Sequence, residues 1–268
     1  MFQFAANIWA GIPSSTVEIR VHANFDPLFC TTNSAVLGQG GPATMWRDFA
    51  GAPLAGHWYH AALANRYAGS DLSGGDDVNI TFNSSLGASN CMPAGWYYGV
   101  DGNEGSQIEL LPVVLHELAH GLGFSTATDG STGNYASGYP TVYDHYLLDV
   151  GTGKHWDEMS ATERAASAVA CRRLVWDGTS VKQHAPPTLN DRSLLRVNAP
   201  AGIAGRVRRG RGGVRSGARH GRRERQRGDG ERCGRIADQR LRGLHQRRGH
   251  GRQDRADRPR FLFASRPR

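Results

Sequence analysis

The amino-acid composition changes abruptly near Gly205, and this change limits what the chain can fold into. From Arg206 to the end there are 22 arginines, no lysine and six acidic residues, a net charge of +16. The preceding residues then hold 10 of the 32 basic and 18 of the 24 acidic residues, a net charge of −8. A segment so rich in charge and so poor in periodic apolar residues does not bury enough surface to offset its ordering entropy. We therefore expect a folded body first and a disordered basic tail over 206–268.

Two other interpretations of the tail remain open. Arginine-rich segments can fold on RNA or DNA, although this one has no interleaved aromatic side chain before Phe261. A shifted reading frame in GC-rich coding DNA would also give abundant Arg, Gly and Ala with no Lys, and it would explain the abrupt onset. Nucleic acid is therefore an expected partner only if the tail is genuine.

The rest of the composition places few limits on the cellular compartment. No apolar run reaches the roughly 18 residues that indicate a membrane span. The N-terminal "MFQFAANIWAGIPSS" has no basic region followed by an apolar core, so it does not resemble a secretory signal. Cys30 and Cys91 both lie in the body and could form a disulfide, or could remain two reduced thiols.

The body is expected to be α+β. Alternating apolar residues predict strands over about 16–23 and 78–82, whereas "HWYHAALANRYAG" predicts a helix that stops at Gly69. Residues 31–55 are rich in Gly, Ala, Pro and Thr and are expected to be loop with short elements of structure, and "GWYYGVDG" is either a strand or a loop. A further helix is expected over about 160–172, with a Ser160–Glu163 capping box. Strands followed by helices favour a short mixed sheet packed against helices.

The strongest chemical signal is "VVLHELAHGLGFSTATDG", which contains an HExxH motif. On an α-helix, His116 and His120 lie four residues apart on one face and can bind one metal ion. Glu117 lies beside them, where it can accept a proton from metal-bound water. This pattern predicts a Zn²⁺ site and amide hydrolysis with Glu117 as the general base.

The residues around the motif support a buried helix. Leu115, Leu118 and Leu122 are spaced to form an apolar stripe, and Pro112 fits the first helical turn. Gly121 and Gly123 would allow a sharp turn after the second histidine. The oxyanion of a hydrolytic intermediate also needs a donor, for which "YPTVYDHYLLD" offers candidates, although packed aromatic side chains are the simpler interpretation of each. These candidates are Tyr139, Tyr143, His145 and Tyr146.

With these residues in place, "HELAHGLGFS" resembles the zinc helix of leishmanolysin-like metallopeptidases. The sequence is closer still to secreted bacterial metallopeptidase-like proteins that carry a protease-associated (PA) domain. The resemblance covers about residues 5–205 and includes "AANIWAG", "HAALANRYAGSDL", "ITFNSSLGASNC", "WYYGVDG", "YPTVYDHYLLD", "LVWDG" and "LLRVNAPAGIAG". It implies a secreted zinc endopeptidase with a zincin-like fold and a protein or peptide substrate.

The sequence departs from this family pattern in its ends. In such proteins the PA domain interrupts the peptidase domain, and the third zinc histidine follows it in an SHWD segment. Here we expect the N-terminal part of a zincin-like domain over 1–198, the first residues of a PA domain over 199–205, and the basic tail from 206. The secretion signal and the SHWD segment are not recognised, so the resemblance also implies an incomplete copy whose activity is reduced or lost.

The third zinc ligand therefore stays open. The compact metzincin pattern places a histidine six residues after the second one, but that position holds Thr126. Asp129 and Asp144 could supply carboxylates, although loop capping is the simpler role for each. His155, in "GKHWDEM", resembles the SHWD segment but could equally be a surface histidine. The remaining possibility is a histidine beyond this chain; His184, His220, His245 and His250 have no supporting context.

Three functions follow from these observations. The first is a zinc-dependent endopeptidase, inactive if the incomplete copy lacks its third ligand. The second is nucleic-acid binding through the tail. The third is a non-catalytic secreted scaffold or adhesion domain. Substrate specificity and oligomeric state are not encoded in any motif of the chain.

Overall fold

A computed structural model describes residues 1–12, 15–170, 173–180, 195–196 and 260–263. The chain forms two compact units. Unit 1 comprises residues 1–128, 135–145 and 256–268, and unit 2 comprises residues 129–134 and 146–255. The boundaries expected at 198 and 205 lie outside the described residues.

A four-stranded mixed sheet is the centre of unit 1, with the strand order β12-β1-β5-β2. β1 (Ile19–Asp26) runs parallel to β5 (Val78–Asn83), and β2 (Gly38–Pro42) and β12 (Arg260–Phe263) pair antiparallel at the two edges. The two expected strands are thus confirmed, with β1 starting three residues later. Val21 and Ala23 are buried, as the two-residue period requires.

The glycine-rich segment expected to be loop contains the β2 edge strand. Its sequence, GQGGP, has no apolar alternation, so the usual signal for a strand is missing. β2 pairs along its length with β5, from Gly38 opposite Phe82 to Pro42 opposite Val78. A flat, side-chain-poor strand is useful here because a helix packs closely on it, as described below.

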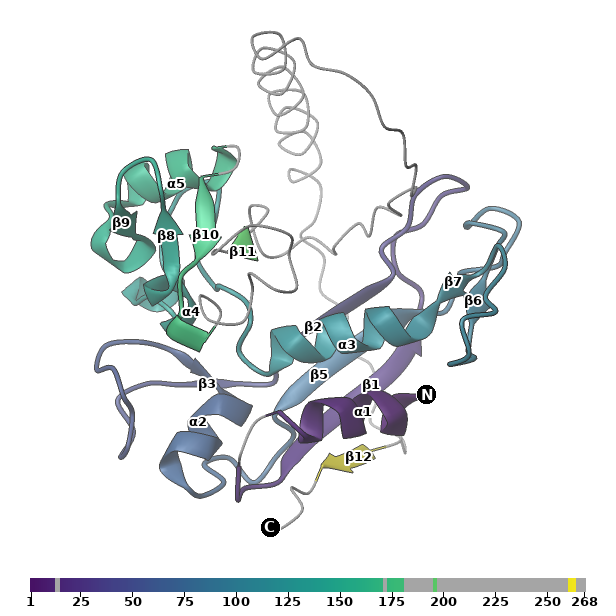
Figure 1. Ribbon diagram of the computed structural model, residues 1–268, viewed down its shortest axis with the longest axis horizontal. Helices are drawn as coiled ribbons and strands as arrows, with labels where there is room; N and C mark the ends of the chain where they lie inside the picture. Colours follow the sequence, from purple (N-terminus) through teal and green to yellow (C-terminus); the bar gives the residue numbers. More distant parts are fainter. Residues whose placement is uncertain (13–14, 171–172, 181–194, 197–259, 264–268) are drawn as a thin grey trace, which may run out of the picture. The chain divides into compact units, whose positions relative to one another are not determined.

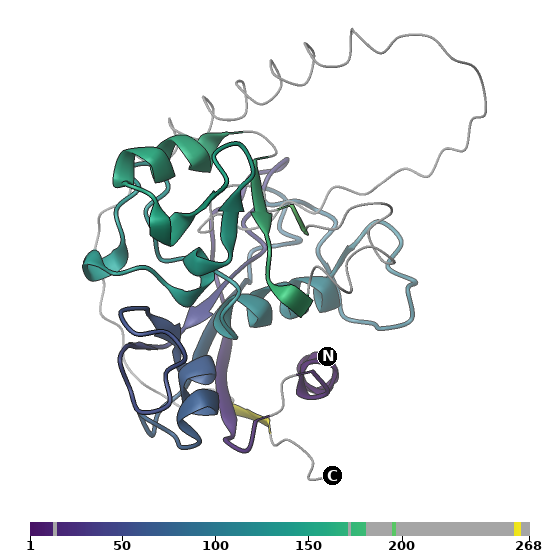
Figure 2. The same cartoon turned by 60° about the vertical axis from the view of Figure 1, so that its left-hand side comes forward.

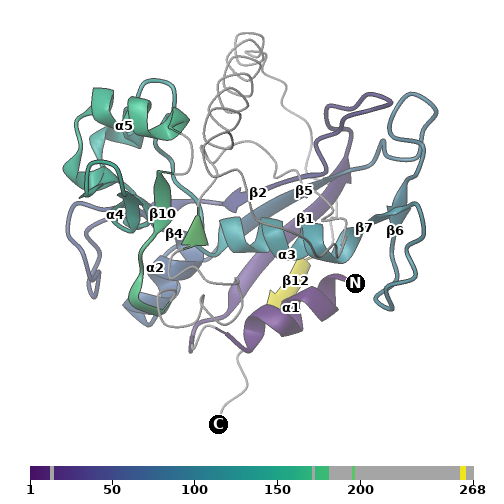
Figure 3. The same cartoon turned by 45° about the horizontal axis from the view of Figure 1, so that its top comes forward.

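Two helices lie on one face of this sheet. α3 (Leu110–Gly121) crosses β2 and β5, and α1 (Phe2–Ala10) contacts both α3 and β12 (Figures 1 and 3). α1 was not expected; its N-cap residue, Met1, makes no side-chain cap bond, although Gly11 follows its last residue. Together the helices and strands enclose the core, which includes Ala5, Val21, Ile80, Phe82, Trp96, Val114 and Leu118.

The remaining parts of unit 1 are short. β3 (Met45–Trp46) pairs with β4 (Tyr59–His60), which leads directly into α2 (Ala61–Ala68). α2 ends at Gly69 in a left-handed conformation, φ 68°, which confirms the expected stop. β6 (Trp96–Tyr97) pairs with β7 (Ile108–Glu109), and η1 (Ala136–Gly138) and α4 (Val142–His145) follow α3.

Unit 2 is built on a small antiparallel sheet with the order β11-β10-β8-β9. Its strands are β8 (Leu147–Asp149), β9 (Lys154–His155), β10 (Leu174–Trp176) and β11 (Leu195–Arg196). The 3-10 helix η2 (Trp156–Glu158) and α5 (Ala161–Val169) lie beside this sheet (Figure 2). Ser160 and Glu163 form the predicted capping box, although α5 ends at Val169 rather than near residue 172.

The structure also bears on the cysteines, the tail and a membrane span. Cys30 and Cys91 form a disulfide with their Cα atoms 5.2 Å apart. Four residues of the tail, Arg260–Phe263, form β12; the other tail residues lie outside the described part. Among the described residues, no helix is long and apolar enough to cross a membrane.

Candidate metal centre

The helix α3 brings the two motif histidines together. It begins after Glu109, with Pro112 in its first turn, so the missing proline N–H leaves no helical hydrogen bond unmade. The Nε2 atoms of His116 and His120 lie 3.0 Å apart. Two nitrogens bound to one tetrahedral zinc at about 2.0–2.1 Å would lie roughly 3.3 Å apart. The pair is therefore close to the geometry that a shared zinc ion requires.

The tautomer of His120 also fits metal binding. Its Nδ1 lies 2.9 Å from the carbonyl oxygen of Phe124, just beyond the helix. A carbonyl oxygen only accepts, so Nδ1 carries the hydrogen and Nε2 keeps its lone pair. Burial, and secondarily the neighbouring His120, hold the pKa of His116 below its usual range, so that ring is neutral at neutral pH.

Glu117 points into the protein on a different face of the helix from the histidines. Its side chain is 3% exposed, and the backbone N–H of Gly40 donates a hydrogen bond to its carboxylate. Burial raises the pKa of Glu117 to about 7, because the charged form loses solvation. A carboxyl group with this pKa can both accept and release a proton near neutral pH.

Glycines of β2 make this burial possible. A Cβ atom at Gly38 would lie 3.0 Å from Cγ of Glu117, and one at Gly40 would lie 2.5 Å from the Glu117 carbonyl oxygen. Any side chain at Gly40 would therefore push α3 away from the sheet. The glycine-rich strand is the reason that a charged residue can occupy the packing face of the helix.

The packing face differs in part from the predicted apolar stripe. Leu118 is buried, whereas Leu115 and Leu122 are only partly buried at the edge of the core. The stripe is rotated because the narrow glycine strand admits the face that carries Glu117. The buried residues of α3 are Leu110, Val113, Val114, Glu117, Leu118 and Gly121.

The two glycines after the motif have different roles. Gly123 has φ 117°, a left-handed conformation that L side chains rarely adopt, so it makes the expected sharp turn. Gly121 is instead the last residue of α3, and a Cβ atom there would lie 2.1 Å from Cγ1 of Val78. Its role is close packing against β5 rather than turning the chain.

Thr126, at the position of the third metzincin ligand, belongs to a cluster of hydrogen bonds around Asp144. The hydroxyls of Thr126 and Thr128 both donate to the Asp144 carboxylate, Thr128 at 3.0 Å. The backbone N–H and hydroxyl of Thr141 donate to the same carboxylate at 2.8 and 2.9 Å. Asp144 is fully buried, and burial raises its pKa although these donors oppose the shift. Both carboxylate oxygens of Asp144 thus accept hydrogen bonds that hold loops together. This role replaces the zinc-ligand role that the sequence left open for Asp144.

The other two candidate ligands are engaged within unit 2. The Nε2 of His155 lies 2.9 Å from Asp177 and its Nδ1 lies 3.4 Å from Glu158, so both ring nitrogens face carboxylates. Asp129 accepts hydrogen bonds from the backbone and hydroxyl of Ser131, which is the loop-capping role expected as its alternative. These contacts explain both residues by local structure.

The candidate oxyanion donors are held by aromatic packing. Tyr143 is buried against Phe124, with ring centroids 5.2 Å apart, and burial raises its pKa. The Arg47 guanidinium lies 3.5 Å from the centroid of the Tyr139 ring. Tyr146, in unit 2, stacks on Trp176 at 5.1 Å. These contacts agree with the simpler interpretation of each aromatic residue.

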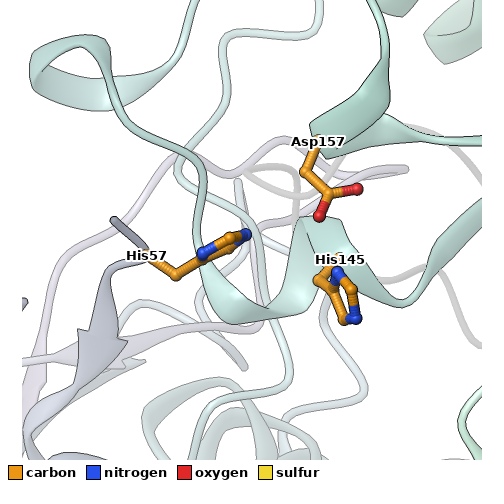
Figure 4. Close-up of side chains that lie close together, drawn as sticks. All are labelled: His57, His145 and Asp157. Carbon is orange, nitrogen blue, oxygen red and sulfur yellow. The ribbon is translucent and has the colours of Figure 1, made fainter. Parts of the chain in front are cut away.

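Two histidines outside the motif carry contacts that sequence patterns did not indicate. His57 packs edge-to-face on His145, the fourth donor candidate, with centroids 5.8 Å apart; both rings are labelled in Figure 4. His60 is 3% exposed, and its Nδ1 lies 2.9 Å from the carbonyl oxygen of His120. Burial lowers the pKa of His60 to about 4. Neither contact has a sequence signal, because the partners are far apart in the chain.

Comparison with known proteins adds no relative to this picture: no family model, curated protein or solved structure matches the chain. The candidate residues are therefore assigned on their geometry. His184, His220, His245 and His250 lie outside the described residues.

Proposed function

We propose that this chain is the catalytic part of a zinc-dependent endopeptidase of the zincin type, with His116 and His120 as zinc ligands and Glu117 as the general base. The observation that carries this proposal is the pair of Nε2 atoms 3.0 Å apart on α3, with the His120 tautomer fixed by Phe124. Two imidazoles at this spacing could supply half of the ligands of a tetrahedral site. The third ligand would come from outside the described residues, or the site would be incomplete and inactive.

The chemistry follows from what each residue can hold. A bound zinc ion would polarise a peptide carbonyl and lower the pKa of its water to about 7. Glu117 would be the group that accepts a proton from the attacking water and returns it to the leaving amine. Its raised pKa suits both steps, because the protonated and ionised forms are nearly equal in energy near neutral pH.

The edge strand β2 supports a peptide as the substrate. β2 ends the sheet order, so within the described residues only its β5 side is paired. An extended peptide could pair with the other edge, where backbone hydrogen bonds give affinity without regard to sequence. This strand also carries Gly40, which contacts Glu117.

The disulfide supports a secreted protein. Cys30 and Cys91 are bridged, and disulfides persist mainly in oxidising compartments. The alternatives of nucleic-acid binding through 206–268 and of a non-catalytic scaffold gain no support from the described residues.

The proposal is tested by measuring zinc and proteolysis on the same preparations. The wild-type chain should bind about one zinc ion, and His116→Ala and His120→Ala should each weaken zinc binding strongly. Glu117→Gln should keep the zinc and reduce cleavage of an unfolded protein substrate by about 10²–10⁴-fold. A wild-type chain that binds no zinc would refute the metal site. A chain that binds zinc and cleaves nothing would refute peptidase activity alone.

A further inference from the structure

We propose that His60 is a positioning residue for the zinc ligand His120, an assignment that rests on the proposed zinc site. His60 lies at the end of β4 and at the start of α2, far from the motif in sequence. Its Nδ1 lies 2.9 Å from the carbonyl oxygen of His120, and it also bonds the backbone of Gly121. Because a carbonyl oxygen only accepts, Nδ1–H of His60 is the donor.

The position of His60 at the N-terminus of α2 does not explain the direction of its side chain. His60 occupies the N-cap position, where Ser, Thr, Asp or Asn would satisfy a free backbone N–H of the helix. Its side chain makes no such cap bond and turns to α3 instead. The strand pairing of His60 with Met45, and the Ala61 N–H bond to the Thr44 carbonyl, fix its backbone. The imidazole is thus held rigidly while it contacts the metal helix.

The contact between His60 and His120 lies in the last turn of α3. The last carbonyls of a helix have no partner within the helix, so the residues there move easily unless they are bonded from outside. His120 is in this last turn, and its carbonyl accepts from the Gly123 N–H at 3.3 Å and from the Ser125 hydroxyl at 3.5 Å, and also from the Leu122 N–H. At 2.9 Å, the His60 bond is shorter than the Gly123 and Ser125 bonds. Gly121, the next residue, is packed directly on Val78.

His120 is therefore held at two points. His60 bonds its backbone carbonyl, and the Phe124 carbonyl accepts from its ring. The first contact fixes the position of the His120 backbone, and the second fixes the rotation of its imidazole ring. Together they set the 3.0 Å separation from His116 that a shared zinc ion needs.

The test measures zinc affinity by competition with a chromophoric chelator, and the visible spectrum of the Co²⁺-substituted protein. His60→Leu places an apolar side chain of similar size at this position and removes the donor. We expect it to weaken zinc binding about 10–100-fold and to change the Co²⁺ spectrum. His60→Asn places an amide N–H near the position of Nδ1 and should restore most of the affinity. His60→Gln moves that donor one bond further out and should restore less.

A matched control separates positioning from general loosening of α2. Ala64 is fully buried on the same helix, and Ala64→Gly should destabilise α2 by a similar route without touching His120. We expect this variant to bind zinc within about threefold of the wild type. If His60→Leu does not fold, the order Asn above Gln still tests the proposal.

The outcomes are distinct. Wild-type affinity in His60→Leu, equal affinities in the Asn and Gln variants, or an equal loss in Ala64→Gly would each overturn the role of His60 and leave the zinc site standing. A wild-type chain without zinc affinity would overturn both.

Discussion

The hydroxyl of Thr126 donates a hydrogen bond to the carboxylate of Asp144. Thr126 occupies the position at which a compact zinc motif would carry its third histidine. The loop after α3 is therefore tied to the segment around α4 by hydrogen bonds, at the point where a metzincin would bind its metal. The described residues thus include two residues proposed as zinc ligands, His116 and His120, whereas Thr126 at the metzincin position ties two loops together.

Asp144→Ala should destabilise the protein by about 3 kcal/mol, because it leaves several buried donors without an acceptor. The measurement is urea unfolding followed by tryptophan fluorescence. Asp129→Ala is the matched control, since the exposed Asp129 also accepts loop hydrogen bonds, and it should cost less than about 1 kcal/mol. Equal costs for the two variants would show that the Asp144 cluster contributes no special stability.

Gly40→Ala should destabilise the protein by about 1–3 kcal/mol, because its Cβ atom would overlap the backbone of Glu117. Gly41 is the natural control: it lies next in the same strand, and a Cβ atom there meets nothing within 4 Å. Thermal unfolding of the two variants distinguishes them. A Gly41→Ala variant as unstable as Gly40→Ala would mean that strand propensity, rather than contact with α3, sets the cost.

Glu117 should make the zinc-free protein less stable as the pH rises. Its folded pKa, about 7, lies above its ordinary value of 4.5, so the folded state binds the extra proton between these values. Its stabilising contribution is complete below pH 4.5 and lost above pH 7, a change of about 3 kcal/mol. With a chelator present, Glu117→Gln should therefore gain stability over the wild type between pH 4.5 and 7. A difference between the two proteins that is constant with pH would contradict the raised pKa.

His60 should act in the opposite direction over nearly the same range. Its folded pKa of about 4 lies below its ordinary 6.5, so its contribution is complete above pH 6.5 and is lost as the pH falls toward 4. The wild type should lose about 3 kcal/mol from this group, and His60→Asn should not. Comparing unfolding curves of the wild type and this variant at pH 7 and pH 4.5 isolates the contribution of His60 to the free energy of unfolding. Parallel loss in both proteins would assign the acid sensitivity to other groups.

The Cys30–Cys91 disulfide closes a loop with a sequence separation of 61. Constraining a loop of this size in the unfolded chain is worth about 4 kcal/mol in the chain-entropy model. Cys30→Ser together with Cys91→Ser should lower the free energy of unfolding by about 2–4 kcal/mol. Addition of a thiol reductant should destabilise the wild type and leave the double variant unchanged. A reductant effect on the double variant would point to another cause.

Local patterns predicted much of the fold. The alternation around Val21 and Ile80, the Gly69 stop and the Ser160 capping box each depend on neighbours in sequence, and each was confirmed. Short structure was expected in residues 31–55, but the strand β2 was not placed there, because its stability comes from pairing with β5 rather than from its own glycines. α1 was missed because it has no N-terminal capping side chain, and its packing against α3 cannot be read from the sequence.

In the candidate site, too, contacts between sequence neighbours were predictable and contacts between distant residues were not. The His116–His120 pair follows directly from helical geometry. The environment of Glu117 does not, since it depends on two glycines of a distant strand. The contact between His60 and His120 likewise joins residues 60 positions apart. Sequence periodicity carries no information about such pairs.

The fit of Glu117 against Gly38 and Gly40 has a consequence for how this site could change over time. The histidine pair and Phe124 lie in one short stretch of sequence, and beyond the helix the pair draws on His60. Glu117, the proposed base, depends on a different strand, β2, for its burial. In the proposed enzyme, a single methyl group added on β2 would displace Glu117 and impair proton transfer, while His116 and His120 would keep their places on the helix. The proposed metal binding and the proposed hydrolysis could therefore be lost separately.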